Sequence, residues 1–421
     1  MSPLPAALRV GVVSTGEGQG SSELGLVVRR VCAALAGSAD VTVLATGPAP
    51  LPPVDDGAVR VVTFAGSRPD PRARAAAHST FFGPEPGAAG VPDCGCTAEM
   101  RRILAADLPY AAQQVLLRSG GGESADLLAH LAAAPYDVVV FAGCSTVSTH
   151  RGVDALRGRC RTALLAGAVD EPAFWMPAVG ELLDAVDTVL TAGEYETALV
   201  ARRSRHRARP RTGTPARPSP PGRAAPRHVG LVLRVAELST RTPPYGYDGR
   251  PTFGVVADWN EPRRHHRRAV TWGTRLHHDL AGRGVVRFVG PGTQRLAPWG
   301  RAPFSNSRVD IWRWMHRSTA IIDPDPAPLV GRVALESLMY GTPVIVPAAS
   351  GASRHHAEAG DGGLWYRSYD EMRACAQAML EPEAAAVLGS QGRAYAEAAY
   401  GDTEAFVRRV RAAVLGGPGE A

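Results

Sequence analysis

The stretch PLVGRVALESLMYGTPVIVP, residues 328–347, decides the fold of the second half of this 421-residue chain. Leu335 and Leu338 lie at helical spacing and form a single apolar face. Gly341 stands where a helix-ending glycine is expected, and Pro343 prevents the helix from continuing. The apolar run that follows is typical of a buried strand. The stretch therefore predicts one helix-to-strand step of an alternating α/β domain.

Apolar strands and amphipathic helices alternate on both sides of this stretch. The expected strands are residues 8–14, 40–46, 59–65, 136–143, 161–167, 187–192, 252–258, 285–290, 319–324 and 343–347. The other expected helices are residues 21–37, 193–203, 266–282, 309–318, 368–380, 391–400 and 403–417. Such alternation favours parallel sheets. The predicted fold class is α/β, with two doubly wound domains facing a cleft and ligand sites at the carboxyl ends of the strands.

Residues 202–228 mark the boundary between the two domains. This segment is nearly all Arg, Pro, Ser, Thr, Ala and Gly, so it cannot bury a core and is expected to be a disordered linker. We expect an N-terminal domain at residues 1–201 and a C-terminal domain at residues 229–392. Helices in residues 393–421 are expected to pack back across the domains. Residues 66–98, rich in Gly, Pro and Ala, are expected to form a long irregular insertion.

The basic residues are unusual in kind. All 46 are arginine, and the chain has no lysine. No lysine can therefore form a Schiff base or hold a phosphate, and an anion site must use arginine, backbone amides or helix N-termini. Most of the excess positive charge lies in the linker, which we expect to be a solvated tether between the domains. Contact with an anionic membrane is the alternative, and nucleic-acid binding is not expected because no aromatic residues interleave with the charge.

Other composition features bound the class of protein. No run of about 18 uncharged apolar residues occurs, and the N-terminus lacks the pattern of a signal peptide, so we expect a cytoplasmic protein. Cys94 and Cys96 are the one close cysteine pair, and their spacing favours free thiols over a metal site. No metal and no cofactor is expected.

A glycine-rich loop follows the first expected strand. Gly18, Gly20 and Ser21 allow the backbone to approach a ligand, and Glu23 opens the helix whose positive end points at that loop. This arrangement suits a phosphate or an acceptor. A plain tight turn is the alternative. No acidic residue ends the second strand, which argues against a nicotinamide-binding domain.

Two acids follow the strand at residues 161–167. Asp170 and Glu171 are expected at its carboxyl end, where they could orient acceptor hydroxyls or act as a base. The alternative is the N-terminal region of a helix, in which Pro172 occupies an early position and the acids favour the helix dipole.

Arginines follow the first strand of the second domain. Arg263 and Arg264 could bind a diphosphate through paired hydrogen bonds. An exposed, basic start of a helix is the alternative.

Glu336 and the loop after residue 347 complete the candidate pocket. The Glu336 carboxylate could accept two hydrogen bonds from a ribose diol, whereas a solvated helix position is the alternative. Gly351 and Ser353 lie in the loop PAASGASRHH, which offers small residues and backbone amides to a phosphate.

These motifs resemble those of GT-B glycosyltransferases, most of all family 4. VALESLMYGTPVIVP, GGLWYRSYDEMRACAQAML and LGSQGRAYAEAAYG are similar to the C-terminal block of that family in order and spacing. GQGSSELG resembles its glycine loop, and LLAGAVDEP followed by DTVLTAGEYETALV resembles its N-terminal His-Asp-Glu-Pro region. The resemblance implies two Rossmann-like domains, an N-terminal, acceptor-side domain and a C-terminal, nucleotide-sugar-binding domain. It also implies transfer of a sugar from a nucleoside diphosphate with retention at the anomeric carbon, without a metal.

The resemblance also implies site residues, and several of them are changed here. Its second conserved glutamate matches Glu336, but Pro328 stands where the first is expected. The expected arginine and histidine match Asp258 and Val169, and the expected lysine falls near Arg263 or Arg264. The catalytic motif is therefore degenerate. Asp325, or Asp323 beside it, could replace the missing glutamate.

The leading hypothesis is a glycosyltransferase that moves a hexose from a nucleoside-diphosphate sugar to an unidentified glycan, lipid or secondary metabolite. Asp170, Glu171 and Asp325 are the candidate catalytic residues. The alternative hypothesis is a non-catalytic relative that binds a sugar nucleotide or a partner protein.

Overall fold

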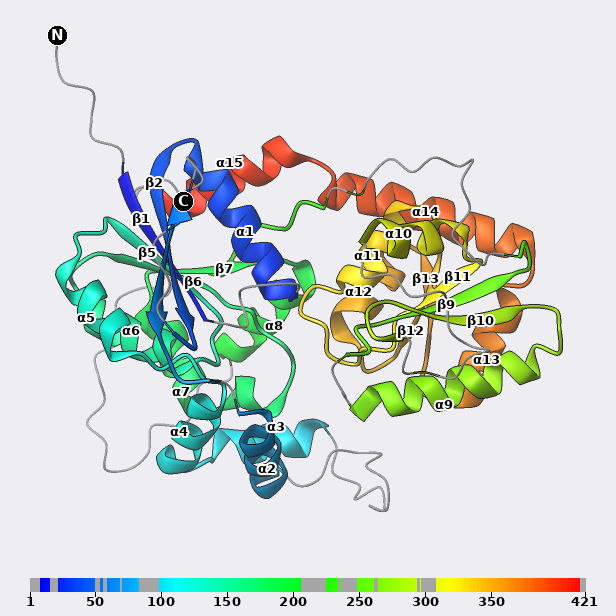
Figure 1. The fold of residues 1–421 in the computed structure, drawn as a ribbon, viewed down its shortest axis with the longest axis horizontal. Coiled ribbons are helices and arrows are strands. Elements are labelled where there is room, and N and C mark those ends of the chain that lie inside the picture. The colour runs from blue at the N-terminus through cyan, green and yellow to red at the C-terminus, as the bar shows by residue number, and fades with distance from the viewer. Residues whose placement is uncertain are drawn as a thin grey trace, which may run out of the picture. The chain divides into compact units, whose positions relative to one another are not determined.

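The computed structural model describes residues 8–15, 22–49, 54–55, 59–68, 70–82, 98–205, 225–233, 235, 248–260, 264–293, 296 and 308–416. The chain divides into two compact units, each with its own sheet (Figure 1). Unit 1 comprises residues 1–231 and 404–421, and unit 2 comprises residues 232–403.

Unit 1 contains an eight-stranded sheet in the order β3-β4-β2-β1-β5-β6-β7-β8. Its strands are β1 (Leu8–Ser14), β2 (Ala39–Gly47), β3 (Val54–Asp55), β4 (Arg60–Ala65), β5 (Val138–Ala142), β6 (Arg161–Leu165), β7 (Thr188–Thr191) and β8 (Arg227–His228). All neighbours pair in parallel except β3, which is antiparallel to β4. The chain reaches the two halves of the sheet by moving outward from β1 in both directions.

Helices connect the strands of unit 1. They are α1 (Glu23–Ala36), α2 (Pro71–Phe82), α3 (Ala98–Ala106), α4 (Tyr110–Ser119), α5 (Ala125–Ala133), α6 (Val147–Leu156), the 3₁₀ helix η2 (Pro172–Trp175), α7 (Pro177–Ala185), α8 (Glu194–Arg205) and α15 (Thr403–Val414). Phe141 and Leu164 on neighbouring strands are fully buried in the core that these helices cover. The strands read as continuous apolar runs because a parallel sheet is buried on both faces.

Unit 2 contains a five-stranded, fully parallel sheet in the order β10-β9-β11-β12-β13. Its strands are β9 (Thr252–Val256), β10 (Val285–Val289), β11 (Ala320–Ile322), β12 (Val344–Pro347) and β13 (Gly363–Tyr366). Its helices are α9 (Arg264–Asp279), α10 (Arg308–Arg317), α11 (Arg332–Met339), α12 (Gly351–Ala359), α13 (Tyr369–Ala378) and α14 (Pro382–Tyr400). Helices α9 and α13 pack together, as do α10, α11, α12 and α14 (Figure 1).

The strand order places a ligand site in each unit. In open parallel sheets, ligands bind outside the carboxyl ends of the strands where the strand order reverses. That reversal lies between β1 and β5 in unit 1 and between β9 and β11 in unit 2. The loop that leads from β11 into α11 therefore lies at the expected position in unit 2.

The fold class predicted from the sequence is confirmed: both units are doubly wound α/β domains with parallel sheets. The expected end of α11 is also confirmed. Gly341 follows that helix with φ 72°, in the left-handed region that glycine adopts without strain.

The expectation of a structureless insertion at residues 66–98 is wrong over residues 71–82, which form α2. Asp70 caps this helix: its carboxylate accepts hydrogen bonds from the backbone N–H of Arg72 at 3.0 Å and of Ala73 at 2.8 Å. Pro71 occupies the first helical position, where the missing N–H costs nothing. The Asp-Pro start was present in the sequence, but the surrounding Gly and Pro residues obscured it.

Three further expectations need correction. The segment after β12 is not a loop throughout, because helix α12 begins at Gly351. The helix expected to start at residue 391 begins at Pro382 and runs to Tyr400, so the domain boundary expected after residue 392 falls inside α14. In the expected linker, residues 202–205 continue α8 and Arg227–His228 form β8. Residues 206–224 lie outside the described residues.

No helix among the described residues is long and apolar enough to span a lipid bilayer.

Candidate functional site

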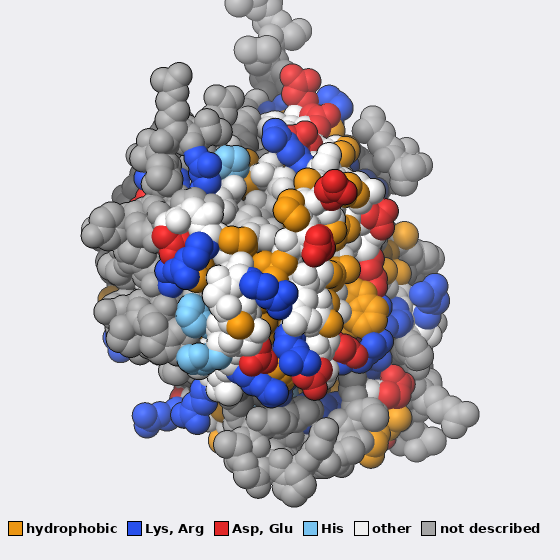
Figure 2. All heavy atoms as spheres, turned by 90° about the vertical axis from the view of Figure 1, so that its right-hand side faces the viewer, with side chains coloured by type: hydrophobic (Ala, Val, Ile, Leu, Met, Phe, Trp, Pro, Cys, Tyr) orange, Lys and Arg blue, Asp and Glu red, His pale blue; other side chains and the backbone are white. Residues whose placement is uncertain are grey.

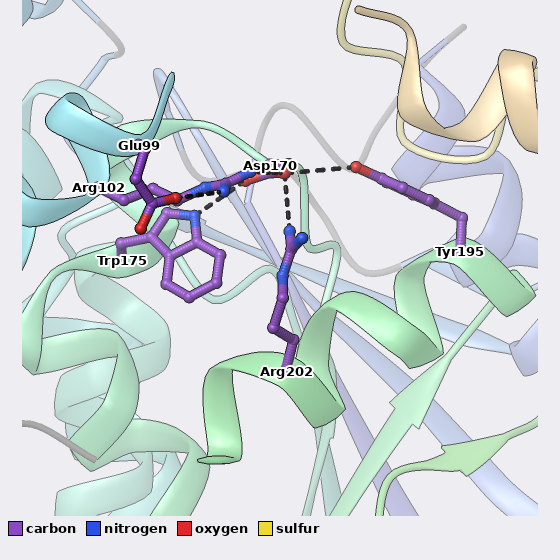
Figure 3. A network of polar contacts seen from close by, with 6 residues as sticks. All are labelled: Glu99, Arg102, Asp170, Trp175, Tyr195 and Arg202. Atoms are coloured by element: carbon purple, nitrogen blue, oxygen red, sulfur yellow. Dashed lines mark hydrogen bonds and ion pairs between the residues drawn. The ribbon is translucent and has the colours of Figure 1, made fainter. Parts of the chain in front are cut away.

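Asp170 is the centre of a polar network in unit 1 (Figure 3). It lies in the loop after β6, and its carboxylate accepts hydrogen bonds from Arg102 on α3, at 3.2 Å from Nε and 2.5 Å from Nη2. The indole N–H of Trp175 donates to it at 2.9 Å, and Arg202 on α8 donates at 2.8 Å. Segments that are far apart in the sequence are thus tied to one carboxylate.

Neighbouring groups extend this network. Tyr195 on α8 reaches the Asp170 carboxylate with its hydroxyl at 3.5 Å, and Glu99 accepts a hydrogen bond from Arg102 at 3.0 Å. The guanidinium groups of Arg102 and Arg202 lie 5.1 and 5.3 Å from the centre of the Trp175 ring, within cation–π range.

The network makes Asp170 a poor general base. Burial raises the pKa of its carboxyl group, but hydrogen bonds from Arg102 and Trp175 and the charges of Arg102 and Arg202 outweigh burial, so the pKa is lowered. A base that works near neutral pH needs the opposite shift. The arrangement instead suits a carboxylate that holds two arginines and an indole in place.

The Glu171 side chain is more exposed than that of Asp170. It occupies the N-cap position of η2, with Pro172 at the first helical position, which agrees with the helix-start alternative. Its carboxylate pairs with Arg74 on α2 at 3.5 Å, and about a third of the side chain is exposed. Of the two acids, Glu171 is the more exposed, with 35% of its side chain exposed against 19% for Asp170.

Glu196 was not singled out from the sequence. It is fully buried on α8, and its two carboxylate oxygens accept hydrogen bonds from the backbone N–H of Ala168 at 2.8 Å and of Ala192 at 2.7 Å. These residues follow β6 and β7, so Glu196 joins the carboxyl ends of two neighbouring strands. It thereby fixes the loop that carries Asp170.

Glu336 in unit 2 is buried, with only 2% of its side chain exposed. It was expected to lie either in solvent or against a ribose. Instead, its carboxylate forms ion pairs with Arg332, one helical turn before it on α11, and with Arg308 at the start of α10. Arg332 donates from Nε at 2.7 Å, and Arg308 donates from Nε at 3.2 Å and from Nη2.

Asp323 and Asp325 lie in the loop between β11 and α11. The Asp323 carboxylate is buried and accepts hydrogen bonds from the Ser353 hydroxyl at 2.8 Å and from the backbone N–H of Asp325 at 3.2 Å. Asp325 caps its own turn by accepting from the backbone N–H of Ala327 at 3.0 Å. Of the pair, Asp325 is partly exposed and Asp323 is not.

His356 holds the other end of the same loop. One ring nitrogen lies 2.9 Å from the Val330 carbonyl oxygen and the other 2.9 Å from the Tyr395 hydroxyl. The carbonyl can only accept, so the histidine donates there and accepts from the tyrosine. Burial lowers the pKa of His356 to about 3, and the ring is therefore neutral near pH 7.

Solved structures resemble this chain over nearly its whole length. An α,α-trehalose 6-phosphate synthase from Burkholderia multivorans matches with 12% identity and a TM-score of 0.62, over 96% of this chain and 98% of that one. A sucrose-phosphate synthase from Thermosynechococcus elongatus matches with 12% identity and a TM-score of 0.60, over 96% and 97%. A further trehalose-6-phosphate synthase matches with 13% identity and a TM-score of 0.60, over 96% and 99%.

The chain has the fold of GT-B glycosyltransferases. At this level of identity the likeness establishes the fold and not the reaction. No family model matches the chain, and neither does any curated protein sequence. The assignment to family 4 therefore stays a prediction.

Several predicted site residues cannot be placed on this GT-B fold. Gly18, Gly20, Ser21 and Arg263 lie outside the described residues. Arg264 is described only as the first residue of α9, without its side chain.

The remaining predicted residues are spread over both units. Glu23 opens α1, directly after the N-cap Ser22. Gly351 and Ser353 lie in the first turn of α12, where Ser353 is bound to Asp323. No group of three or more His, Cys, Asp or Glu side chains that could hold a metal occurs among the described residues.

The arginines that pair with Asp170 and with Glu336 were not identified from the sequence. Arg102 lies in α3, which begins at the end of the segment expected to be irregular, and Arg308 lies on a helix that is 28 residues from Glu336 in the sequence. Only Arg332 carried a local signal, because it precedes Glu336 by four residues, the spacing of neighbours on one helix face.

Glu196 should give the stability of unit 1 a pH dependence. Burial raises the pKa of its carboxyl group from 4.5 to about 7, against the lowering effect of backbone N–H groups. Between these values the folded chain holds a proton that the unfolded chain has released, so the free energy of unfolding falls as pH rises from about 4.5 to about 7.

The test is Glu196→Gln, which removes the titration. Relative to the unmodified chain, the variant should gain about 2 kcal/mol between pH 5 and pH 8, measured as hydrogen exchange of β6 and β7. The comparison cancels the histidines, which titrate in both proteins. A difference that does not change with pH would show that Glu196 is ionised throughout.

Proposed function

We propose that this chain transfers a hexose from a nucleoside-diphosphate sugar to an acceptor, with retention at the anomeric carbon. The observation that carries the proposal is the loop between β11 and α11. It lies where the strand order of unit 2 reverses and leads into a helix whose buried Glu336 holds two arginines. Nucleotides bind to such folds at that edge of the sheet.

The similar solved structures support this donor class. One of them, with 12% identity, is described as bound with UDP-2-fluoro glucose. The names of the others describe synthases of sugar phosphates. For this chain we therefore propose a nucleoside-diphosphate hexose as donor, and hexose phosphates belong in the panel of acceptors beside glycans, lipids and secondary metabolites.

Roles for individual residues follow from their surroundings. Glu171 and Asp325 have partly exposed carboxylates and are the proposed reactive acids. Asp170 is proposed to hold Arg102 and Arg202 in place in the acceptor-side unit. Gly351 begins α12 and would present backbone N–H groups to a phosphate.

A non-catalytic role is the second candidate, and two observations favour it. Pro328 is buried at the position where the resemblance implies the first glutamate, and the Asp170 carboxylate is neutralised by two arginines. On the face shown in Figure 2, the described basic and acidic side chains are interspersed with small hydrophobic groups. Among the described residues on that face, no continuous apolar surface that would suit a partner protein stands out.

The test is a panel of nucleoside-diphosphate sugars with and without the acceptors, scored for release of the nucleoside diphosphate. The proposal expects release from one donor that increases when an acceptor is present, and a product of unchanged anomeric configuration by NMR. Binding in a thermal shift assay without release would support the non-catalytic role. Neither binding nor release with any donor would contradict both.

A further inference from the structure

Helices α10 and α11 face each other along one seam. Residues at four-residue spacing line it: Arg308, Trp312 and His316 on α10, and Arg332, Glu336 and Tyr340 at α11 and its C-cap. In the lower half the Tyr340 ring centre lies 6.4 Å from that of Trp312 and 5.9 Å from that of His316. The upper half, at the start of both helices, is the ionic cluster of Arg308, Arg332 and Glu336.

This cluster leaves Glu336 little capacity for a ribose. A carboxylate offers about four acceptor positions. Three donors already occupy the Glu336 oxygens: Nε and Nη2 of Arg308 and Nε of Arg332. A diol would have to displace an arginine and leave a buried ion pair broken, which is costly. Glu336 is therefore better placed to hold the arginines than to hold a sugar.

The two guanidinium groups remain accessible while Glu336 does not. Exposure is 31% for the Arg308 side chain, 17% for Arg332 and 2% for Glu336. The three side chains together carry a single positive charge. The planar guanidinium group matches phosphate oxygens with two parallel N–H donors.

Two helix N-termini meet beside the cluster. Gly331 precedes α11 with φ 64°, and a Cβ there would lie 3.0 Å from the Ser353 hydroxyl in the first turn of α12. Helix N-termini favour anions. The Asp323 carboxylate is buried and accepts a hydrogen bond from the Ser353 hydroxyl.

We propose that Arg308 and Arg332 are the diphosphate clamp of unit 2, and that Glu336 is a positioning residue that fixes both guanidinium groups. This inference rests on the proposed function for the identity of the ligand. It assigns the anion-binding role to residues other than Arg263 and Arg264.

The experiment is calorimetric titration of the full chain with inorganic pyrophosphate and with UDP, ADP and GDP at low ionic strength. Arg308→Met and Arg332→Met should each weaken binding of pyrophosphate and of the bound nucleotide about 30-fold, as expected for one charge-assisted contact. Arg332→Lys keeps the positive charge but loses the paired N–H donors of the guanidinium group. It should bind pyrophosphate more tightly than Arg332→Met and less tightly than the unmodified chain. Arg393→Met removes an exposed arginine of the same unit that pairs with Glu397, and should bind as the unmodified chain does.

A triple variant separates binding from stability. Arg308→Met, Arg332→Met and Glu336→Leu together replace the ionic cluster by apolar groups, an exchange that other proteins tolerate. Hydrogen exchange should show that this variant remains folded, and titration should show that it no longer binds pyrophosphate. Pyrophosphate binding that depends on the arginines, without turnover of any donor, would retain the clamp and contradict sugar transfer. Nucleotide binding that survives both single Met variants would overturn the clamp and leave sugar transfer standing. A chain that binds neither pyrophosphate nor nucleotide overturns the clamp.

Discussion

Glu336→Ala should destabilise unit 2 by about 3 kcal/mol. The substitution leaves the guanidinium groups of Arg308 and Arg332 facing each other without the carboxylate that separates them, and Arg332 is only 17% exposed. Removal of one partner from a buried ion pair costs more than the pair contributes, because an uncompensated charge stays behind. Hydrogen exchange of β11, α11 and β12 measures the effect within unit 2.

The matched control is Glu397→Ala. Glu397 also pairs with an arginine four residues away, but both side chains are more than half exposed, so the loss should stay below about 0.5 kcal/mol. The triple apolar variant should recover most of the stability that Glu336→Ala loses. Equal stability of Glu336→Ala and the control would show that the cluster is not held as a unit.

Asp170→Asn should destabilise unit 1 by a similar amount, about 3 kcal/mol. The amide keeps the size of the side chain but loses the charge that holds Arg102 and Arg202, and its NH₂ group turns a donor toward other donors. The loss should be greatest near neutral pH. Because the pKa of Asp170 is lowered on folding, its contribution is present above its ordinary value of 3.8 and disappears as pH falls below that.

Trp175 gives this prediction a local readout, since it is the one tryptophan in the sequence of residues 1–231 and 404–421. Its indole donates to Asp170, so its fluorescence should change in Asp170→Asn when the tryptophans of unit 2 are replaced by phenylalanine. Asp154→Asn is the control, because Asp154 pairs with Arg157 on the exposed surface of α6. If Asp154→Asn changed the stability and the Trp175 fluorescence as much as Asp170→Asn does, the Asp170 network would contribute no more than an exposed ion pair.

The fold was accessible from the sequence because its signals are local. The buried strands are continuous apolar runs, and the end of α11 is written in Gly341 and Pro343. The helix expected at residues 368–380 is present as α13, where the Ser368 hydroxyl caps the first turn by accepting from the backbone N–H of Glu371 at 3.2 Å. Helix α2 was missed because its start depends on Asp70 and Pro71 within a segment otherwise rich in residues that disfavour helices.

The site was less accessible because its contacts are not local. Glu336 was identified as important, but its burial and its two arginine partners depend on how α10 packs on α11. Asp170 was identified as a strand-end acid, yet its role changed once Arg102 and Arg202 were seen beside it. A sequence names the charged residue, whereas the packing of distant segments decides whether that charge is free to react.

Unit 2 is proposed to bind a nucleoside diphosphate at the carboxyl edge of its sheet. Hydrogen exchange of the full chain, with and without the nucleoside diphosphate found in the titrations, tests this because it locates the ligand. We expect protection of residues 323–336 and of the first turn of α12. Protection confined to unit 1, or no protection at saturating nucleotide, would contradict it.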